Sequence, residues 1–209
     1  MDLVLEHAKP IVFVVDDDMS VRDSLKLFIE SVGWQPETFA SGREFLSYRG
    51  AAAPSCLVLD VNLPDLSGLD LQTLVADRTG MPIIFISGYG DVPMTVRAMR
   101  AGAMEFLTKP LHADVLLHAI GNAIERSCAE LTNATRMSAL RATYAALSPR
   151  EKEVMALVVS GRLNKQVGGE LGISEITVTA HRGKMMKKMK AATFSELVRM
   201  ADRLHPPMF

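Results

Sequence analysis

The stretch IVFVVDDD at residues 11–18 decides the fold of the amino-terminal half. Its first five residues are all apolar, and four of them are β-branched, which predicts a strand buried on both faces. Such strands are typical of parallel sheets that carry helices on each side. Three aspartates follow at the point where the strand ends, so the sequence places acidic groups at one edge of the predicted sheet.

The same strand-then-helix pattern repeats through residues 1–125. Further strands are predicted at residues 37–39, 56–59, 82–86 and 105–107, and helices at 19–32, 41–48, 67–77 and 93–101. A helical pattern resumes at residue 111. Five such repeats predict an α/β, doubly wound, five-stranded parallel sheet with helices on both faces.

Polar side chains follow four of the predicted strands. Asp16 and Asp17 come after the first strong strand, Asp60 after the second, Ser87 after the third and Lys109 after the last. Because the carboxyl ends of parallel strands share one edge, we expect these residues to converge there. Three carboxylates in one site repel one another, and Mg²⁺ would relieve that repulsion.

This set of residue types suits phosphoryl transfer. Asp60 could attack phosphorus as a nucleophile, Lys109 could neutralise phosphoryl charge and the Ser87 hydroxyl could bond a phosphoryl oxygen. The third aspartate, Asp18, is expected to cap the helix at 19–32 instead.

Composition separates the two halves of the 209-residue chain. Residues 1–125 hold 9 Lys and Arg against 17 Asp and Glu, whereas residues 126–209 hold 14 against 7. The basic half is therefore expected to meet an anionic partner such as nucleic acid. Cys56 and Cys128 have neither zinc-ligand nor disulfide spacing. The chain shows no signal peptide or apolar run long enough to span a membrane, so we expect a cytoplasmic protein without membrane contact.

The second half is helical throughout by pattern. We expect the α/β domain to cover residues 1–125, followed by a helical linker at 126–146 and a smaller all-α domain at 147–209. The linker region is either a continuation of the preceding helix or two helices joined by a loop around residues 127–133. The pattern does not decide between them.

Capping signals predict four helices in the last domain. Ser148 and Glu151 form a capping box for a helix that runs to residue 160, and further helices are predicted at 164–171, 175–190 and from Thr193 to about 204. The second and third helices, joined by a tight turn, form a helix-turn-helix pattern whose second helix would enter the DNA major groove.

The helix at 175–190 has two predicted faces. Val178, Met185 and Met189, with Ile176 and Met186 beside them, are expected in the core. The exposed side is expected to carry Thr179, Ala180, Arg182, Gly183, Lys184 and Lys187. Arg182 could make a bidentate contact with guanine, and the lysines could contact phosphates. His181 is expected to be packed rather than to read a base.

The first half resembles the receiver domain of two-component response regulators. The resemblance rests on IVFVVDDD (11–18), CLVLDVNLPDLSG (56–68), PIIFISGYGDVPMTVRAMRAGA (82–103) and EFLTKP (105–110). It implies a flavodoxin-like fold with strand order 2-1-3-4-5, and a cis bond between Lys109 and Pro110.

The same resemblance implies roles for individual residues. Asp60 would be the phospho-acceptor, and Asp16, Asp17, Asp60 and the backbone carbonyl of Asn62 would bind Mg²⁺ or Mn²⁺. Lys109 would pair with the phosphate, while Ser87 and Phe106 would form the switch. Asp65 stands where many members have glycine, and we expect little effect.

The second half resembles the LuxR-type DNA-binding domain of the NarL/FixJ response regulators. The matching stretch is LSPREKEVMALVVSGRLNKQVGGELGISEITVTAHRGKMMKKMKAATFSELV (147–198), and residues 90–103 favour the FixJ-like branch. The resemblance implies base contacts at Thr179, Ala180 and Gly183 and phosphate contacts at Lys165, Thr177, Lys184 and Lys188. Gly168 and Gly169 lie inside a predicted helix, where together they cost about 1–2 kcal/mol unless close packing requires them.

We therefore expect a DNA-binding transcription regulator switched by phosphorylation of Asp60. It is not expected to be an enzyme beyond Mg²⁺-dependent self-phosphorylation and autodephosphorylation at that residue. The implied partners are a sensor histidine kinase, promoter DNA and RNA polymerase. Phosphorylation would promote a homodimer or release an inhibitory contact between the two halves.

Two other functions fit the residues less well. A phosphorylation-independent DNA binder with a vestigial receiver would usually lack an acidic residue or the lysine, and none is missing here. An aspartyl-nucleophile phosphohydrolase would need an acid/base aspartate two residues after Asp60, where this sequence has Asn62.

Overall fold

The computed structural model describes residues 9–49, 53–76, 78, 80–88 and 90–204. The chain divides into two compact units, residues 1–132 and 133–209. The predicted end of one helix at Asp77, and the outermost residues of both predicted domains, lie outside the described residues.

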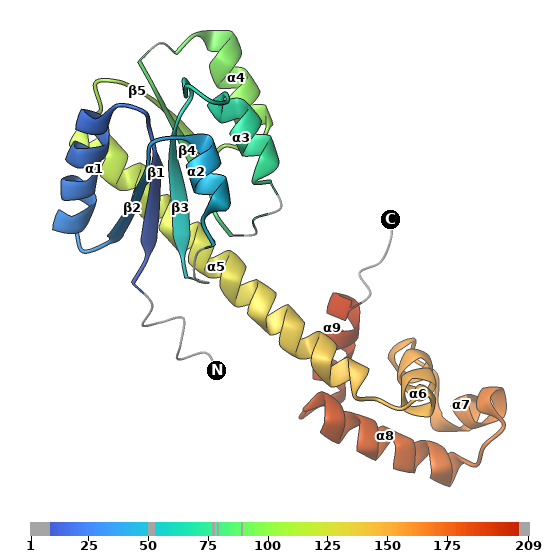
Figure 1. Cartoon of the computed structure of the whole chain (residues 1–209). Coiled ribbons are helices and arrows are strands. Elements are labelled where there is room, and N and C mark those ends of the chain that lie inside the picture. Colours follow the sequence, from blue (N-terminus) through green and yellow to red (C-terminus); the bar gives the residue numbers. More distant parts are fainter. Residues whose placement is uncertain (1–8, 50–52, 77, 79, 89, 205–209) are drawn as a thin grey trace. The chain divides into compact units, whose positions relative to one another are not determined.

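The first unit contains the predicted five-stranded sheet (Figure 1). Its strands are β1 (Ile11–Val15), β2 (Gln35–Phe39), β3 (Ser55–Asp60), β4 (Ile83–Ser87) and β5 (Glu105–Thr108). Every pair is parallel, and the order is β2-β1-β3-β4-β5, which confirms the predicted topology. In this register the carboxyl ends of β1, β3, β4 and β5 lie along one edge.

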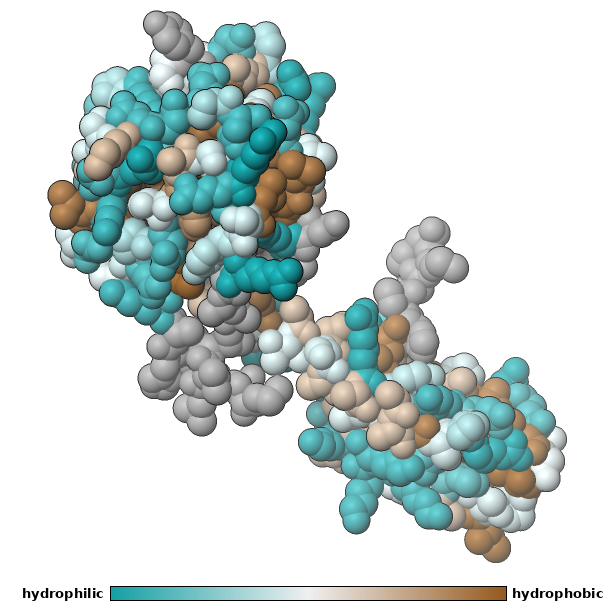
Figure 2. Space-filling model, viewed as in Figure 1, coloured by the Kyte–Doolittle hydropathy of each residue, from teal (hydrophilic) through white to brown (hydrophobic). Residues whose placement is uncertain are grey.

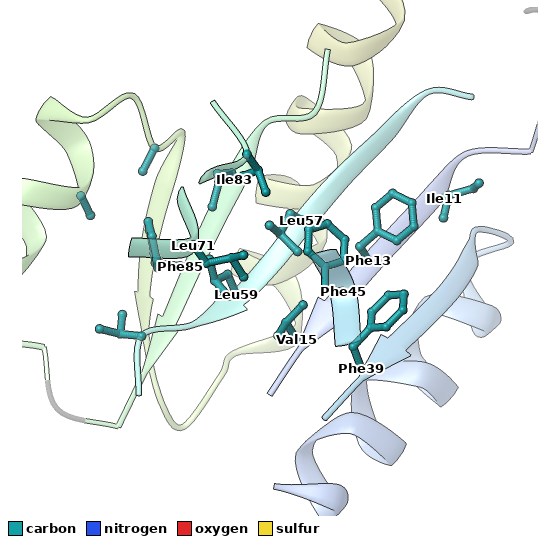
Figure 3. Packing of buried hydrophobic residues seen from close by; sticks show 14 residues of the cluster. Ile11, Phe13, Val15, Phe39, Phe45, Leu57, Leu59, Leu71, Ile83 and Phe85 are labelled. Carbon is teal, nitrogen blue, oxygen red and sulfur yellow. The ribbon is translucent and has the colours of Figure 1, made fainter. Parts of the chain in front are cut away.

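Helices cover both faces of the sheet. They are α1 (Met19–Ser31), α2 (Gly42–Ser47), α3 (Gly68–Leu74), α4 (Val92–Arg100) and the first part of α5 (Ala113–Ala145). On one face Phe45 packs edge-on against Phe13 and Phe39, and Leu71 of α3 lies beside Leu59 and Phe85 (Figure 3). On the other face Val12 and Val14 pack against α1 and α5. Adjacent residues of β1 therefore serve opposite cores, as the unbroken apolar run predicts.

Several element ends differ from the sequence prediction by a few residues. The strand predicted at 37–39 starts at Gln35, because it pairs with β1 from Ile11 onward. The helix predicted at 93–101 starts at Val92, since the Asp91 carboxylate accepts a 2.7 Å hydrogen bond from the Met94 amide and acts as the N-cap. The helix predicted at 67–77 ends at Leu74.

The region of the predicted linker lies in one continuous helix. α5 has 33 residues, so the alternative with a loop around residues 127–133 is wrong. Ser127 is fully buried; its hydroxyl accepts a 2.8 Å hydrogen bond from the Ser55 amide and donates to the Gly80 carbonyl. These contacts tie α5 to the amino-terminal edge of the sheet, well past residue 125.

The second unit contains the four predicted helices. They are α6 (Pro149–Val159), α7 (Asn164–Leu171), α8 (Glu175–Met189) and α9 (Phe194–Leu204). Their shared core includes Val154, Val167, Val178, Met185, Met189 and Leu197, with Leu140 and Tyr144 of α5 packed against it. The capping box of Ser148 and Glu151 is present, and Gly172 ends α7 with a positive φ of 67°. The helix-turn-helix prediction is therefore confirmed.

One packing prediction in this unit is wrong. Ile176 was expected in the core, yet it is 83% exposed. Two residues along an α-helix turn the side chain by about 200°, so Ile176 points away from the core that Val178 enters.

The surface of the second unit is mixed in character. Figure 2 shows hydrophilic side chains over much of its visible face, with apolar residues in separate groups.

Candidate functional sites

The predicted acidic residues meet at the carboxyl edge of the sheet. Asp16 directly follows β1 and Asp60 ends β3, and these two strands are neighbours. Oxygen atoms of Asp16, Asp17 and Asp60 all lie within 4.8 Å of one another. Asp16 and Asp60 are buried, whereas Asp17 is exposed. We call these three residues with Lys109 the acidic pocket.

Lys109 joins the two buried carboxylates. Its Nζ lies 2.7 Å from Asp16 Oδ2 and 2.7 Å from Asp60 Oδ2. Burial disfavours the ammonium ion, but hydrogen bonds and attraction from both carboxylates more than offset this and raise the pKa of Lys109. Burial also raises the pKa of Asp16, although the Lys109 hydrogen bond opposes that shift. One lysine thus balances part of the charge of three aspartates.

The backbone around Asp16 is held by a residue that the sequence analysis missed. Arg22, one turn into α1, donates 2.8 Å hydrogen bonds from Nη1 to the carbonyls of both Asp16 and Asp17. Asp18 accepts a 2.8 Å hydrogen bond from the Ser20 amide and caps α1, as predicted. The signal for Arg22 was its place in the first turns of the following helix, which does not by itself identify its target.

Gly68 lies against the backbone of Asp60. A Cβ atom at Gly68 would sit 2.4 Å from the Asp60 carbonyl oxygen, so only glycine fits there. The Gly68 amide also donates a 2.9 Å hydrogen bond to the Val61 carbonyl. On its other side, Asp60 Oδ1 accepts a 3.0 Å hydrogen bond from the amide of exposed Asn62. These contacts fix the position of the Asp60 carboxylate.

Ser87 and Phe106 lie on adjacent strands beside the pocket. Ser87 ends β4 and is fully buried, and its carbonyl accepts a 2.8 Å hydrogen bond from the Lys109 amide. Phe106 in β5 is half-buried, with its ring centroid 6.1 Å from that of Phe85. The loop after β4 passes close to this ring, since a Cβ at Gly90 would lie 3.0 Å from Phe106 Cε1. The bond between Lys109 and Pro110 is cis, as the resemblance implies.

Asp65 does more than the sequence analysis expected. Its carboxylate accepts hydrogen bonds from the Gly42 and Arg43 amides, at 3.2 and 2.8 Å. Burial opposes ionisation, but these amide hydrogen bonds lower the pKa of Asp65. Asp65 therefore helps to cap α2 from a distant loop.

The chemistry of the donor set fits a hard divalent cation. Asp16, Asp17 and Asp60 offer carboxylate oxygens within reach of one ion, which is the ligand type that Mg²⁺ prefers. Asp16 and Asp60 both share Lys109 as a counter-charge, so Asp17 is the carboxylate with the most negative charge left to balance.

The predicted DNA-contacting residues fall into two groups. Lys165, Thr179, Ala180, Gly183 and Lys184 are exposed, and Thr177 is half-buried with its amide bonded to Ser174 at 3.1 Å. Arg182 and Lys188 are engaged within the protein. Arg182 Nη1 donates a 2.6 Å hydrogen bond to Asn164 Oδ1, and Lys188 Nζ lies 2.6 Å from Glu151 Oε2.

Two residues in this unit make contacts between helices that the sequence pattern did not predict. Asn164 bonds both Arg182 and, at 3.2 Å, the Thr179 hydroxyl. Glu151 is almost fully buried and links the start of α6 to the end of α8. The hydrogen bond from Lys188 makes the largest contribution to lowering the pKa of Glu151, and the hydrogen bond from the Ser148 amide makes the next largest.

Among the described residues, none of the helices combines the length and the apolar character that a membrane span requires.

Comparison with known proteins identifies both units. A family profile described as "Response regulator receiver domain" matches residues 12–121, and one described as "Bacterial regulatory proteins, luxR family" matches residues 145–201. The chain belongs to the response regulators that join a receiver domain to a LuxR-type DNA-binding domain, and it is a DNA-binding transcription regulator rather than an enzyme of the usual kind. This pairing of domains implies a histidine kinase and promoter DNA as partners.

Individual relatives support the predicted FixJ-like branch. The chain is 49% identical to "Nodulation protein W" of Bradyrhizobium diazoefficiens, over 94% of this chain and 87% of that protein. It is 37% identical to "Transcriptional regulatory protein FixJ" of the same organism, over 92% and 94%. Among solved structures, response regulator StyR is 43% identical, with a TM-score of 0.85 over 94% of this chain and all of that one.

Proposed function

We propose that Asp60 accepts a phosphoryl group from a sensor histidine kinase and that this switches promoter binding. The observation that carries this proposal is the bridge from Lys109 Nζ to Asp16 and Asp60, 2.7 Å each, beside exposed Asp17. This contact supports a role for Asp60 as the nucleophile and for Lys109 as the cation that pairs with the phosphoryl group.

The chemical step at Asp60 is a transfer between two nucleophiles. A carboxylate oxygen of Asp60 bonds to phosphorus as the bond from phosphorus to a kinase histidine nitrogen breaks, and the electron pair stays on that nitrogen. Mg²⁺ or Mn²⁺, when bound by Asp16, Asp17, Asp60 and the Asn62 carbonyl, supplies positive charge for the phosphoryl oxygens. Lys109 exchanges its contact with Asp60 for one with the phosphoryl group.

Phosphorylation of Asp60 would change the protein surface through movements of Ser87 and Phe106. The phosphoryl group carries about −1.5 to −2 charge, and a hydrogen bond from Ser87 would draw the end of β4 towards it. Phe106 is packed against Phe85 and against the loop at Gly90, so movement of that loop changes the space for its ring. This couples the pocket to α4 and β5.

The proposed output is a homodimer that places two copies of α8 on two half-sites of promoter DNA and brings RNA polymerase to the promoter. Release of an inhibitory contact between the two halves is the alternative output. Base contacts are proposed at Thr179, Ala180 and Gly183, and phosphate contacts at Lys165, Thr177, Lys184 and Lys188. Residues 1–125, 126–146 and 147–209 would act as receiver, linker and DNA-binding domain in the cytoplasm.

The test compares the full chain with an Asp60→Asn variant in Mg²⁺ and beryllofluoride, a phosphoryl mimic. Light scattering behind a sizing column measures the oligomeric state, and binding to a pool of promoter duplexes is measured in parallel. We expect a shift to dimer and tighter binding in the natural chain alone.

Other outcomes separate the alternatives. Tighter DNA binding without dimer formation would favour domain release. Equal DNA binding by both proteins, with and without the mimic, would support a receiver that no longer switches the protein.

A further inference from the structure

The outward strip of α8 has an unusual composition for a helix that meets DNA. Four exposed residues recur at helical spacing along it, namely Ile176, Ala180, Gly183 and Lys187. The opposite side of the helix holds Val178, Met185 and Met189 in the core. This strip is therefore the part of α8 farthest from the rest of its unit.

The amino-terminal half of the strip is apolar. Helix-turn-helix proteins read bases with this end of the recognition helix, and here it presents Ile176, Ala180 and Gly183, which have no hydrogen-bonding side chain. Ile176 is 83% exposed, so its side chain has almost no contact within the protein. Positive charge appears farther along, at exposed Lys184 and Lys187, whereas the exposed Glu175 carboxylate lies beside the start of the strip.

Neighbouring polar groups are already occupied. The Thr179 hydroxyl donates to the Glu175 carbonyl at 3.0 Å and accepts from Asn164 at 3.2 Å. The Arg182 guanidinium donates to Asn164 Oδ1 at 2.6 Å and lies 5.3 Å above the Phe194 ring. These contacts hold α7, α8 and α9 together. Few side-chain groups at this end of α8 are therefore left to form hydrogen bonds with bases.

We propose that Ile176 reads the 5-methyl group of thymine in the major groove, with Ala180 lying against the same groove edge. The methyl group is the apolar mark that distinguishes thymine there, and apolar side chains contact it. Lys184 and Lys187 supply phosphate attraction that does not depend on sequence. This inference rests on the proposed DNA binding and assigns its specificity to apolar contact instead of to hydrogen bonds from Thr179 or Arg182.

The experiment uses the full chain with Mg²⁺ and beryllofluoride to select duplexes from a random library. The enriched duplex is then made again with single thymine-to-uracil replacements, which remove only the methyl group. We expect one position in each half-site to bind about four-fold more weakly as uracil, the effect of one buried methyl-sized group. Ile176→Ala should bind the thymine and uracil forms of that position equally.

Matched variants separate methyl recognition from general binding. Lys187→Ala should weaken both forms by the same factor and leave their ratio unchanged. Replacing guanines by 7-deazaguanine, which lacks the N7 acceptor, should change affinity less than loss of the methyl group does.

Three results would overturn the proposal. They are an unchanged thymine-to-uracil ratio in Ile176→Ala, no sensitivity to uracil at any position, and a dominant effect of 7-deazaguanine. Failure of the chain to retain any duplex would instead remove the proposed DNA binding, and the methyl contact with it.

Discussion

The acidic pocket and the outer surface of α8 use charge in opposite ways. In the pocket, Lys109 contacts Asp16 and Asp60 directly, and all three side chains are largely removed from water. On α8, Lys184 and Lys187 stand apart in solvent. A buried carboxylate that loses its partner is costly, whereas an exposed lysine contributes little to folding. Substitutions in the pocket should therefore change stability, and those of Lys184 and Lys187 on the outer surface of α8 should change binding alone.

The largest expected effect on stability comes from replacing a lysine by alanine in the acidic pocket, compared with the same replacement on the outer surface of α8. Lys109→Ala leaves Asp16 and Asp60 without their shared cation, so the free energy of unfolding should fall by about 3 kcal/mol in the absence of divalent ions. Lys187→Ala should change it by less than about 0.5 kcal/mol. Denaturant unfolding measures both variants. Added Mg²⁺ should restore part of the loss in Lys109→Ala only, and equal losses would remove the contrast between the regions.

A second comparison concerns the backbone beneath Asp60. In Gly68→Ala the new Cβ would meet the Asp60 carbonyl at 2.4 Å, so the loop must move, at a cost of about 2 kcal/mol. Gly121 lies in α5 with no described atom within 4 Å of a Cβ, and Gly121→Ala should instead stabilise by about 1 kcal/mol. The melting temperature should fall in Gly68→Ala and rise in Gly121→Ala, and thermal unfolding measures both shifts. Gly68→Ala should also accept the phosphoryl mimic more weakly, and normal acceptance would show that the position of Asp60 is less constrained.

The second unit has one ion pair that resembles the pocket, between Glu151 and Lys188. Glu151→Gln should lower the free energy of unfolding by about 1.5 kcal/mol at neutral pH, because a charged hydrogen bond is lost. The folded state lowers the pKa of Glu151, so its contribution is present above the unfolded pKa and is lost as the pH falls through the folded pKa. The natural chain and the variant should therefore converge in stability in acid. A constant difference across pH would argue against ionisation as the cause.

The smallest expected effect on stability is a difference between alanine substitutions at two adjacent glycines in α7. A Cβ at Gly168 would lie 2.7 Å from the Ile173 carbonyl oxygen, whereas one at Gly169 has no described neighbour within 4 Å. Gly168→Ala should thus destabilise by about 1 kcal/mol and Gly169→Ala should stabilise by a similar amount. Melting temperatures of the two variants provide the measurement. Two changes of the same sign would mean that α7 is not held against the turn.

Local patterns in the sequence determined much of this protein. Unbroken apolar runs predicted the buried parallel strands, and capping residues such as Asp18 and Ser148 marked helix starts, because both signals lie in consecutive residues. Asp16, Asp60, Ser87 and Lys109 were found for the same reason, since parallel strands bring their carboxyl ends to one edge. Residues 127–133 carry no strong helix breaker, but the apolar stripe there is irregular. The sequence therefore did not decide whether α5 is continuous, and the structure did.

Tertiary structure decided which of those residues touch. The pairing of Lys109 with both Asp16 and Asp60 and the close fit of Gly68 depend on strands and loops far apart in the sequence. Arg182 has the side chain of a base reader, yet Asn164 holds it because α7 packs across α8. Ile176 is a contrasting case, because helix periodicity alone sets it about 200° from Val178 and so in solvent. A residue's chemistry is set by its side chain, but its partners are set by long-range packing, which local sequence patterns do not encode.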